Sequence, residues 1–283
     1  MLVTGEEILQ DAHKNNYAIG AFNVNNMEII QAIMEAAEET NSPVILQASQ
    51  GGLEYAGIEY IAELGKLAAR KAAVPVALHL DHGTDFSQVM LCIRHGFTSV
   101  MIDGSRFNIE DNINITKKVI EAAHSVGVSV EAELGKIGNT ENNIDSNKNE
   151  FGFTVPKDAL KFVRETSVDY LAVAVGTAHG VYNGEPNIDF SRIKAIKDIT
   201  NIPLVLHGSS GVPNEAIEKA VLSGINKINI DTDLRMAFTN EIKKIIEKKP
   251  NNIDPRKMLN PARKAMKEVI KEKMYLFGSS NRA

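Results

Sequence analysis

The sequence of 283 residues is poor in cysteine, in long hydrophobic runs and in excess positive charge. Its one cysteine, Cys92, excludes an intrachain disulfide, and a lone thiol in an apolar stretch is typical of a reducing compartment. No apolar run approaches the ~20 residues needed to span a bilayer. Residues 1–7 also lack the basic region and apolar core of a signal peptide. We therefore expect a soluble, cytoplasmic protein that binds no membrane.

The charge balance argues against nucleic acid as a partner. The formal net charge is −5 at pH 7, so the chain has no overall attraction for a polyanion. A phosphate group would have to be held locally by backbone amides, arginines or a metal ion. Hydrophobic residues make up 43% of the chain and charged residues 24%, which is the balance of an ordinary globular protein.

Short apolar runs rich in β-branched residues alternate with helical patterns along the chain. Such runs are typical of parallel strands that are buried on both faces. The expected strands are 17–24, 43–49, 74–81, 98–103, 128–134, 169–176, 202–207 and 226–231. Their alternation with helices predicts a closed (β/α)8 TIM barrel, an α/β fold that often takes ~250 residues. Residues 1–283 are therefore predicted to form one barrel domain.

Local signals support the helices. Thr4 and Glu7 form a capping-box pattern, and Asn108 is placed to cap the helix after the fourth strand. After the seventh strand, Pro213 suits a first helical position and Gly224 follows the end of the helix. An open, doubly wound sheet is the lesser alternative, because no glycine-rich dinucleotide turn follows the first strand.

Two regions exceed the minimal barrel. Residues 135–155 are rich in Asn and Gly and have no periodicity, and a loop of this length in a compact domain is usually functional or disordered. We expect a mobile active-site loop there. Residues 234–283 are more than one helix needs, so we expect extra C-terminal helices that pack on the barrel or on a partner subunit.

Polar residues gather at the predicted carboxyl ends of the strands, where the active sites of (β/α)8 barrels lie. Polar side chains are costly to bury near apolar strands unless they have partners, so their accumulation at one rim indicates a functional site. The set comprises Ser49, Asp81, His82, Asp103, Glu133, His179, His207, Asn229, Asp231 and Thr232.

Three of the seven histidines share one setting. His82, His179 and His207 each follow a predicted strand, and each precedes a glycine that permits close backbone approach. Three imidazoles with an open fourth position form a catalytic zinc site. A lone histidine is more often structural, but three that converge at one rim reverse that expectation. His95 also precedes a glycine, yet this pair ends a helix and is interpreted as a cap.

The rim carboxylates allow more than one role. Asp81 precedes a candidate ligand, so it either supports the metal site or acts as an acid and base toward the substrate. Asp103 and Glu133 either bind a second metal position or hydrogen-bond the histidines, and of these two roles we favour the supporting one.

The segments after the last two strands are typical of an anion site. They are 208–211 (Gly-Ser-Ser-Gly) and 229–232 (Asn-Ile-Asp-Thr), with Arg235 one turn into the next helix. Phosphate sites of this fold favour that corner, where backbone N–H groups and a helix N-terminus point outward. A tight turn that uses Ser and Gly only for its geometry is the alternative.

Several blocks, taken in order, resemble those of class II fructose-bisphosphate aldolases. They are 79–83 (His-Leu-Asp-His-Gly), 129–135 (Ser-Val-Glu-Ala-Glu-Leu-Gly), 176–180 (Gly-Thr-Ala-His-Gly), 203–211 (Pro-Leu-Val-Leu-His-Gly-Ser-Ser-Gly) and 227–233 (Lys-Ile-Asn-Ile-Asp-Thr-Asp). The match runs from about residue 3 to the segment 277–280. The resemblance implies a metal-dependent lyase of glycolysis that reversibly cleaves fructose 1,6-bisphosphate to dihydroxyacetone phosphate and glyceraldehyde 3-phosphate.

The same resemblance implies roles for individual residues. His82, His179 and His207 are implied to hold the catalytic zinc. Asp81 is the implied acid and base at the C4 oxygen, and Glu141, in the loop after the fifth strand, is implied to move a proton at C3. The implied substrate and phosphate contacts are Ser49, Gly180, Gly208, Ser210, Asn229, Asp231, Thr232 and Arg235.

An assembly and a second ion are also implied. Arg256 resembles an arginine that reaches the second phosphate from the partner subunit, so we expect a homodimer or a higher homo-oligomer. A monovalent cation, Na⁺ or K⁺, is implied near the zinc and the phosphate.

Two places depart from the family pattern. Asn183 stands where relatives carry a lysine, which removes a phosphate contact and also occurs in tagatose-bisphosphate-type relatives. The loop segment 138–142 keeps the glutamate but lacks a glycine and a carboxylate of the usual pattern. Asp231 favours fructose, because tagatose-type relatives tend to carry a small residue there. Tagatose 1,6-bisphosphate or another ketose phosphate is therefore the alternative substrate.

Other kinds of activity fit the sequence less well. A barrel zinc hydrolase would use Asp81 to activate a metal-bound water, but the phosphate corner and the loop glutamate argue against it. A Schiff-base aldolase needs a well-placed amine, for which Lys136 just past the fifth strand is the candidate. A non-catalytic scaffold would have no use for three rim histidines beside a carboxylate.

Overall fold

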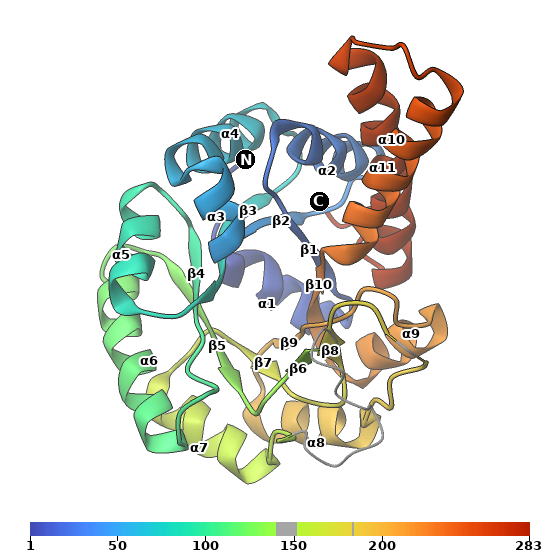
Figure 1. The fold of residues 1–283 in the computed structure, drawn as a ribbon. Helices are drawn as coiled ribbons and strands as arrows, with labels where there is room; N and C mark the ends of the chain where they lie inside the picture. The colour runs from blue at the N-terminus through green and yellow to red at the C-terminus, as the bar shows by residue number, and fades with distance from the viewer. Residues whose placement is uncertain (140–151, 183) are drawn as a thin grey trace.

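The computed structural model describes residues 1–139, 152–182 and 184–283, and a closed barrel of parallel strands forms its centre. Around the barrel the strands follow the order β1-β10-β9-β7-β5-β4-β3-β2, and helices surround them (Figure 1). Neighbours in the sheet are successive barrel strands of the chain, with β1 and β10 closing the ring. The predicted (β/α)8 architecture is confirmed.

The expected strands are all present, and they differ from the prediction only at their ends. In chain order they are β1 (Ile19–Asn23), β2 (Val44–Ser49), β3 (Val76–Gly83), β4 (Ser99–Ile102), β5 (Ser129–Leu134), β7 (Tyr170–Val173), β9 (Leu204–Leu206) and β10 (Ile225–Ile230). The end of β3 matters most for function. It continues beyond Asp81, because Gly83 pairs with Ile102 of β4 after a shift in register.

Helices cover the outside of the barrel. They are α1 (Gly5–Asn15), α2 (Met27–Thr40), α3 (Gln50–Ala56), α4 (Ile58–Lys71), α5 (Phe86–Arg94), α6 (Ile109–His124), α7 (Pro156–Thr166), α8 (Phe190–Thr200), α9 (Asn214–Ser223), α10 (Thr232–Lys248) and α11 (Pro255–Phe277). The predicted caps at Thr4, Asn108 and His95 are confirmed. Pro213 precedes α9 instead of occupying its first position, because its ψ of 141° is extended.

The amino end of the barrel interior is apolar. Ile8, Leu9 and Ala12 of α1 form a buried cluster with side chains from several strands. The strand members are Ile19, Ala21, Ile45, Ala77, Tyr170, Ala172 and Val205. In Figure 1, α1 lies behind the strands, across the barrel. Helix α1 therefore closes this end, and the carboxyl ends of the strands remain open.

The expected C-terminal helices are α10 and α11, which pack on each other and project beyond the barrel (Figure 1). Helix α11 also packs against α2 and β1, and the Phe277 carbonyl accepts a hydrogen bond from the Ala18 amide at 3.0 Å. The C-terminal segment is thus fixed to the first strand of the barrel. Within the part of the chain that the structure describes, no helix is both long and apolar enough to cross a membrane.

The predicted loop 135–155 lies largely outside the described residues, as do Glu141 within it and Asn183 further along. Its described start forms β6 (Gly138–Asn139), which pairs in parallel with β8 (Ala178–His179). The sequence did not predict this small sheet. It joins the beginning of the loop to one of the three rim histidines.

Candidate active site

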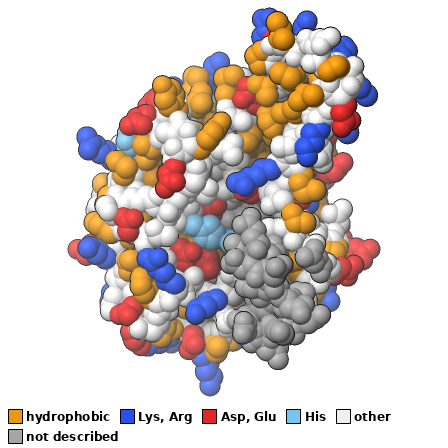
Figure 2. All heavy atoms as spheres, viewed as in Figure 1, with side chains coloured by type: hydrophobic (Ala, Val, Ile, Leu, Met, Phe, Trp, Pro, Cys, Tyr) orange, Lys and Arg blue, Asp and Glu red, His pale blue; other side chains and the backbone are white. Residues whose placement is uncertain are grey.

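The open end of the barrel contains a cavity of about 290 Å³. Figure 2 shows histidine and acidic side chains in the middle of this face. The cavity is lined by Asn23, Ser49, Asp81, His82, His179, Gly180, Gly208, Ser209, Ser210, Asn229, Asp231, Thr232 and Arg235. Apart from Arg256, the structure thus brings together the residues predicted to contact substrate or phosphate.

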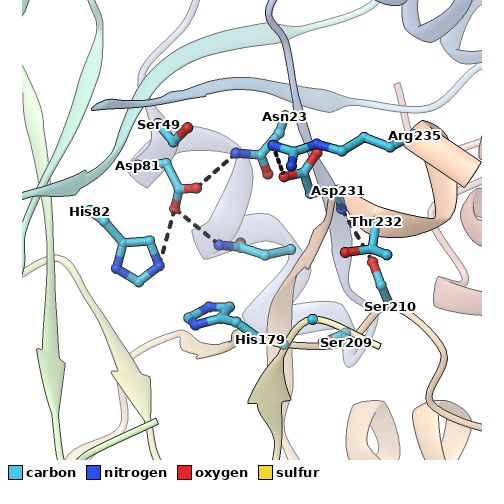
Figure 3. A pocket seen from close by; sticks show the side chains of 13 residues that line it. Asn23, Ser49, Asp81, His82, His179, Ser209, Ser210, Asp231, Thr232 and Arg235 are labelled. Atoms are coloured by element: carbon cyan, nitrogen blue, oxygen red, sulfur yellow. Dashed lines mark hydrogen bonds and ion pairs between the residues drawn. The ribbon is translucent and has the colours of Figure 1, made fainter. Parts of the chain in front are cut away.

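The three predicted metal ligands converge beside this cavity. One ligand nitrogen of each of His82, His179 and His207 lies within 4.8 Å of the others. His82 Nε2 is 2.9 Å from His207 Nδ1, and Figure 3 shows His82 and His179 close to each other at the cavity. His207 is fully buried behind the cavity wall. Three imidazoles in this arrangement fit a zinc ion or a similar divalent metal.

The backbone around the ligands requires glycine at two positions. A Cβ atom at Gly83 would lie 2.4 Å from the Met101 carbonyl oxygen, and one at Gly208 would lie 2.4 Å from the Ala178 carbonyl oxygen. His82 itself has φ 52°, a left-handed conformation uncommon for residues other than glycine. The glycines therefore allow neighbouring segments to approach the histidines, as the sequence pattern predicted.

Carboxylates contact one ring nitrogen each of His82 and His207. His82 Nδ1 is 3.1 Å from Asp103 Oδ2 and 3.9 Å from Glu133 Oε2. His207 Nε2 is 2.8 Å from Glu131 Oε1. Both roles left open for Asp103 and Glu133 fit this geometry, because ligand atoms of His82, Asp103 and Glu133 also lie within 4.8 Å of one another. Glu131 is a supporting residue that the sequence analysis missed.

Burial and neighbouring charges set the protonation of the histidines and of Glu133. Burial lowers the pKa of His179 to about 4 and that of His207 well below its usual value. Burial also opposes the charge on His82, but Asp81 and Asp103 outweigh it and raise the pKa of His82 to about 10. Burial and the Asp103 charge raise the pKa of Glu133 to about 8. Two neutral imidazoles therefore offer lone pairs at neutral pH.

Asp81 is an ionised carboxylate held from two sides. Burial alone would raise the pKa of Asp81, but His82 and His207 lower it to about 2. The Asn23 amide donates to Asp81 Oδ2 at 2.9 Å, and the Asn229 amide donates to Oδ1 at 3.2 Å. Figure 3 shows Asp81 between Asn23 and His82. A fixed, charged carboxylate next to the histidines is suited to accept a proton.

Asn23 was missed in the sequence, although a signal was present. It is the last residue of β1, so it reaches the same rim as the other candidates. Its side chain is also fixed, because its Oδ1 accepts a hydrogen bond from Gln47 Nε2 at 2.6 Å. A polar residue at the end of an otherwise apolar run was the available indication.

The predicted anion corner lies on the opposite wall. Ser210 Oγ accepts from the backbone amides of Asp231 and Asp233 at 3.3 Å and 3.4 Å, so the segments after β9 and β10 meet. Arg235 Nη2 is 2.6 Å from Asp231 Oδ2. Helix α10 begins at Thr232, which lines the cavity, so the N-terminus of the helix lies at this wall. This arrangement fits a phosphate group.

The described part of the chain does not place Arg256 or Glu141 at the cavity. Arg256 lies at the start of α11, where its side chain is 89% exposed and paired with Asp254 at 3.0 Å. Within one chain it is not among the residues that line the cavity. Glu141 lies outside the described residues. The described residue Asn139, just before it in the chain, pairs in register with His179.

The fold and the rim together define a barrel with three converging histidines that could hold a metal ion and an acidic group beside them. Residues 3–282 match the family model described as fructose-bisphosphate aldolase class-II. The chain therefore belongs to the class II fructose-bisphosphate aldolase family, whose members are lyases that use a divalent metal. The resemblance seen in the sequence and the aldolase class are thereby confirmed.

Individual relatives agree along the whole chain. The chain is 48% identical to a fructose-bisphosphate aldolase of Thermus caldophilus, with 100% of both chains covered. It is 42% identical to a sulfofructosephosphate aldolase of Alkalicoccus urumqiensis, over 99% of this chain and 98% of the relative. Among solved structures, the YdjI aldolase of Escherichia coli K12 superposes with a TM-score of 0.90 at 37% identity, covering 100% of both chains.

Proposed function

We propose that this protein is a zinc-dependent aldolase that reversibly cleaves fructose 1,6-bisphosphate to dihydroxyacetone phosphate and glyceraldehyde 3-phosphate. The supporting observation is one cavity that combines three converging imidazoles, the ionised Asp81 and the N-terminus of α10. Metal-dependent cleavage of a phosphorylated ketose uses these three elements: a site for a Lewis acid, a proton acceptor and an anion-binding wall.

The residues divide the reaction between them. Zinc held by the three imidazoles would polarise the ketose carbonyl as a Lewis acid. Asp81 accepts the proton of the C4 hydroxyl while the C3–C4 bond breaks, because the Asn23 and Asn229 amides hold its carboxylate in place. Glu141 then returns a proton at C3, an assignment supported by the pairing of the nearby Asn139 with His179.

The phosphate groups are held by different parts of the molecule. Ser210, Arg235 and the N-terminus of α10 bind one phosphate. A monovalent cation, Na⁺ or K⁺, would neutralise part of the charge of this phosphate. Arg256 binds the other phosphate from a partner subunit. Two observations support this dimer: Arg256 projects from the exposed end of the α10–α11 hairpin, and hydrophobic side chains gather over the same hairpin (Figure 2).

Steady-state assays test the reaction. Purified enzyme is offered fructose and tagatose 1,6-bisphosphates side by side, before and after chelation, and triose phosphate release is measured. We expect cleavage of fructose 1,6-bisphosphate with the higher kcat/KM, and loss of cleavage in the isosteric Asp81→Asn variant with its zinc retained. Phosphate release or amide hydrolysis without aldol cleavage would instead indicate the hydrolase alternative.

A second substrate is favoured by a specific observation. Asn183 replaces the lysine of fructose-type relatives, and a relative with 42% identity is named a sulfofructosephosphate aldolase. Tagatose 1,6-bisphosphate and sulfofructose phosphate are therefore the alternatives. If either gives the highest kcat/KM in the same assay, the metal and Asp81 assignments stand and the fructose assignment falls.

The proposed dimer has its own test. Arg256→Ala and His179→Ala variants are each inactive on this proposal, for different reasons. When they are mixed under conditions that exchange subunits, a heterodimer has one site with both His179 and the partner's arginine. We expect part of the activity to return, whereas a monomeric enzyme would recover none.

A further inference from the structure

Two charged side chains, Glu131 of β5 and Lys227 of β10, lie inside the barrel next to the histidine cluster. Both are fully buried, and Lys227 Nζ is 2.8 Å from Glu131 Oε2. Neither lines the cavity. Buried charges are costly even when paired, and a pair of this kind is weak support for stability alone. Their position beside the site suggests a role there.

Glu131 fixes the imidazole of His207. Its Oε1 lies 2.8 Å from His207 Nε2, so an ionised Glu131 keeps the proton on Nε2. The other ring nitrogen, Nδ1, then faces His82 Nε2 at 2.9 Å with its lone pair available to a metal. The tautomer and the orientation of His207 therefore depend on the Glu131 carboxylate.

Lys227 reaches the proton acceptor along a second route. Its ammonium donates a hydrogen bond to Asn229 Oδ1 at 2.8 Å, which leaves the Asn229 amide nitrogen to donate to Asp81 Oδ1 at 3.2 Å. The contact of Lys227 with Glu131 is an ion pair that lacks hydrogen-bond geometry. One ammonium thus balances the carboxylate that holds His207 and orients the amide that holds Asp81.

His79 does not substitute for Lys227 as the balancing cation. Its Nε2 is 3.4 Å from Glu131 Oε2, while its Nδ1 lies 2.6 Å from Ser99 Oγ. Burial and the Lys227 charge lower the pKa of His79 well below its usual value, so the ring is neutral. The counter-charge inside the barrel comes from Lys227.

We propose that Lys227 is a positioning residue that holds the metal ligand His207, through Glu131, and the base Asp81, through Asn229, in one arrangement. Its effect on His207 follows from the geometry of the ligands. Its effect on Asp81 rests on the proposed aldolase function. A single buried side chain thereby links metal binding to proton transfer.

Two variants separate positioning from simple charge balance. Lys227→Met removes the ammonium and leaves the Glu131 charge buried, whereas the double variant Glu131→Gln/Lys227→Met removes both charges with side chains of similar size. Three quantities are measured: the free energy of unfolding of the metal-free protein, the zinc dissociation constant by chelator competition, and kcat and KM of the zinc-saturated enzyme. The adjacent Asn226→Ala is the matched control, since Asn226 is buried but bonds the Tyr17 carbonyl away from the site.

We expect the double variant to recover folding stability relative to Lys227→Met without recovering the site. Its zinc dissociation constant should stay roughly 10- to 100-fold above that of the parent, the usual effect of losing a partner of a metal ligand. Its kcat should fall about tenfold or more, and KM should change less. Asn226→Ala should be less stable and keep both site properties. If Lys227→Met does not fold, the double variant is compared with Glu131→Gln alone. A lower kcat in the double variant than in Glu131→Gln then supports the role of Lys227, and equal kcat values overturn it.

The proposal is overturned if the double variant binds zinc and turns over like the parent, because the pair then only balances charge. It is also overturned if Asn226→Ala weakens zinc binding equally, because any loss of stability would then have that effect. The zinc measurements use no substrate. A parent that binds zinc but cleaves no ketose phosphate would refute the proposed function and leave the test of the His207 route intact.

Discussion

The two ends of the barrel interior differ in chemistry although the same strands build both. In β1 the inward positions change from Ile19 and Ala21 at the amino end to Asn23 at the carboxyl end, and in β2 they change from Ile45 to Gln47. Alternate residues of a strand share a face, so this change occurs along one continuous surface. The amino end is sealed by α1, and the carboxyl end carries the cavity.

Because of this difference, the amino end should contribute mainly to the stability of the fold and the carboxyl end mainly to catalysis. An apolar cluster contributes mainly through burial, and its aliphatic members tolerate exchange for side chains of similar volume. At the carboxyl end, the polar side chains orient one another through hydrogen bonds and ion pairs. A single isosteric substitution there can therefore remove a contact that orients a neighbouring side chain. Substitutions at the carboxyl end should therefore change activity much more than stability, and those at the amino end should do the reverse.

The largest effect is expected for His179→Ala at the carboxyl end. Loss of one of three ligands should abolish tight zinc binding and reduce aldol cleavage by far more than the roughly 10- to 100-fold cost of losing a supporting partner. Zinc content by atomic absorption and kcat are the measurements. Full activity in a demonstrably metal-free His179→Ala protein would refute the metal assignment.

The loop glutamate should give the next largest effect. Glu141→Ala should lower kcat by roughly 10²-fold or more, the usual contribution of a positioned acid or base, while zinc remains bound. Glu141→Gln is the matched control: it keeps the shape and removes the charge, so it should be equally slow. Unchanged turnover, with chemistry shown to be rate-limiting, would contradict the assigned role.

A smaller effect is expected at Asn183, which lies outside the described residues and is therefore assigned to neither end of the barrel. Asn183→Lys should lower KM for fructose 1,6-bisphosphate about tenfold, since ~1.4 kcal/mol corresponds to that factor. Hydrogen bonds to charged groups contribute roughly 1.5–3 kcal/mol, so the gain is reasonable. Asn183→Gln should leave KM for fructose 1,6-bisphosphate unchanged. Asn183→Lys should leave KM for an unphosphorylated ketose unchanged. Equal improvement of both substrates would show that Asn183 does not face the phosphate.

The sequence predicted the barrel and most of the rim because both depend on local pattern. Each strand was visible as an apolar run, and in parallel strands the polar residue after each run must reach the same edge. His82, His179 and His207 could therefore be placed together without any pairing information. The resemblance to a known family then supplied roles that spacing alone left open for Asp81.

What the sequence missed depends on contacts between distant strands. The link between Glu131 and Lys227 requires that β5 and β10 face each other inside a closed barrel, and nothing in either strand alone shows this. The continuation of β3 to Gly83 depends on a register shift against β4. Likewise, β6 exists only because β8 pairs with it.

The smallest effect tests the amino end. Thr4 Oγ1 accepts the Glu7 amide at 3.2 Å, and Glu7 Oε2 accepts the Thr4 amide at 2.7 Å, so the two residues cap α1 reciprocally. Thr4→Ala removes one of these bonds and should lower the free energy of unfolding by about 1 kcal/mol. Thr4→Ser keeps the hydroxyl acceptor and should stay within a few tenths of a kcal/mol of the parent.

Urea unfolding of the metal-free protein measures both variants, and zinc affinity and kcat are measured alongside. Since α1 contacts the apolar cluster at the amino end, its cap can influence the site only through the stability of the whole fold. Zinc affinity and kcat of Thr4→Ala should therefore equal those of the parent at temperatures where both proteins are folded. A tenfold fall in kcat of fully folded Thr4→Ala would show that the amino end and the site are coupled through the barrel, and the division between the two ends would then be wrong.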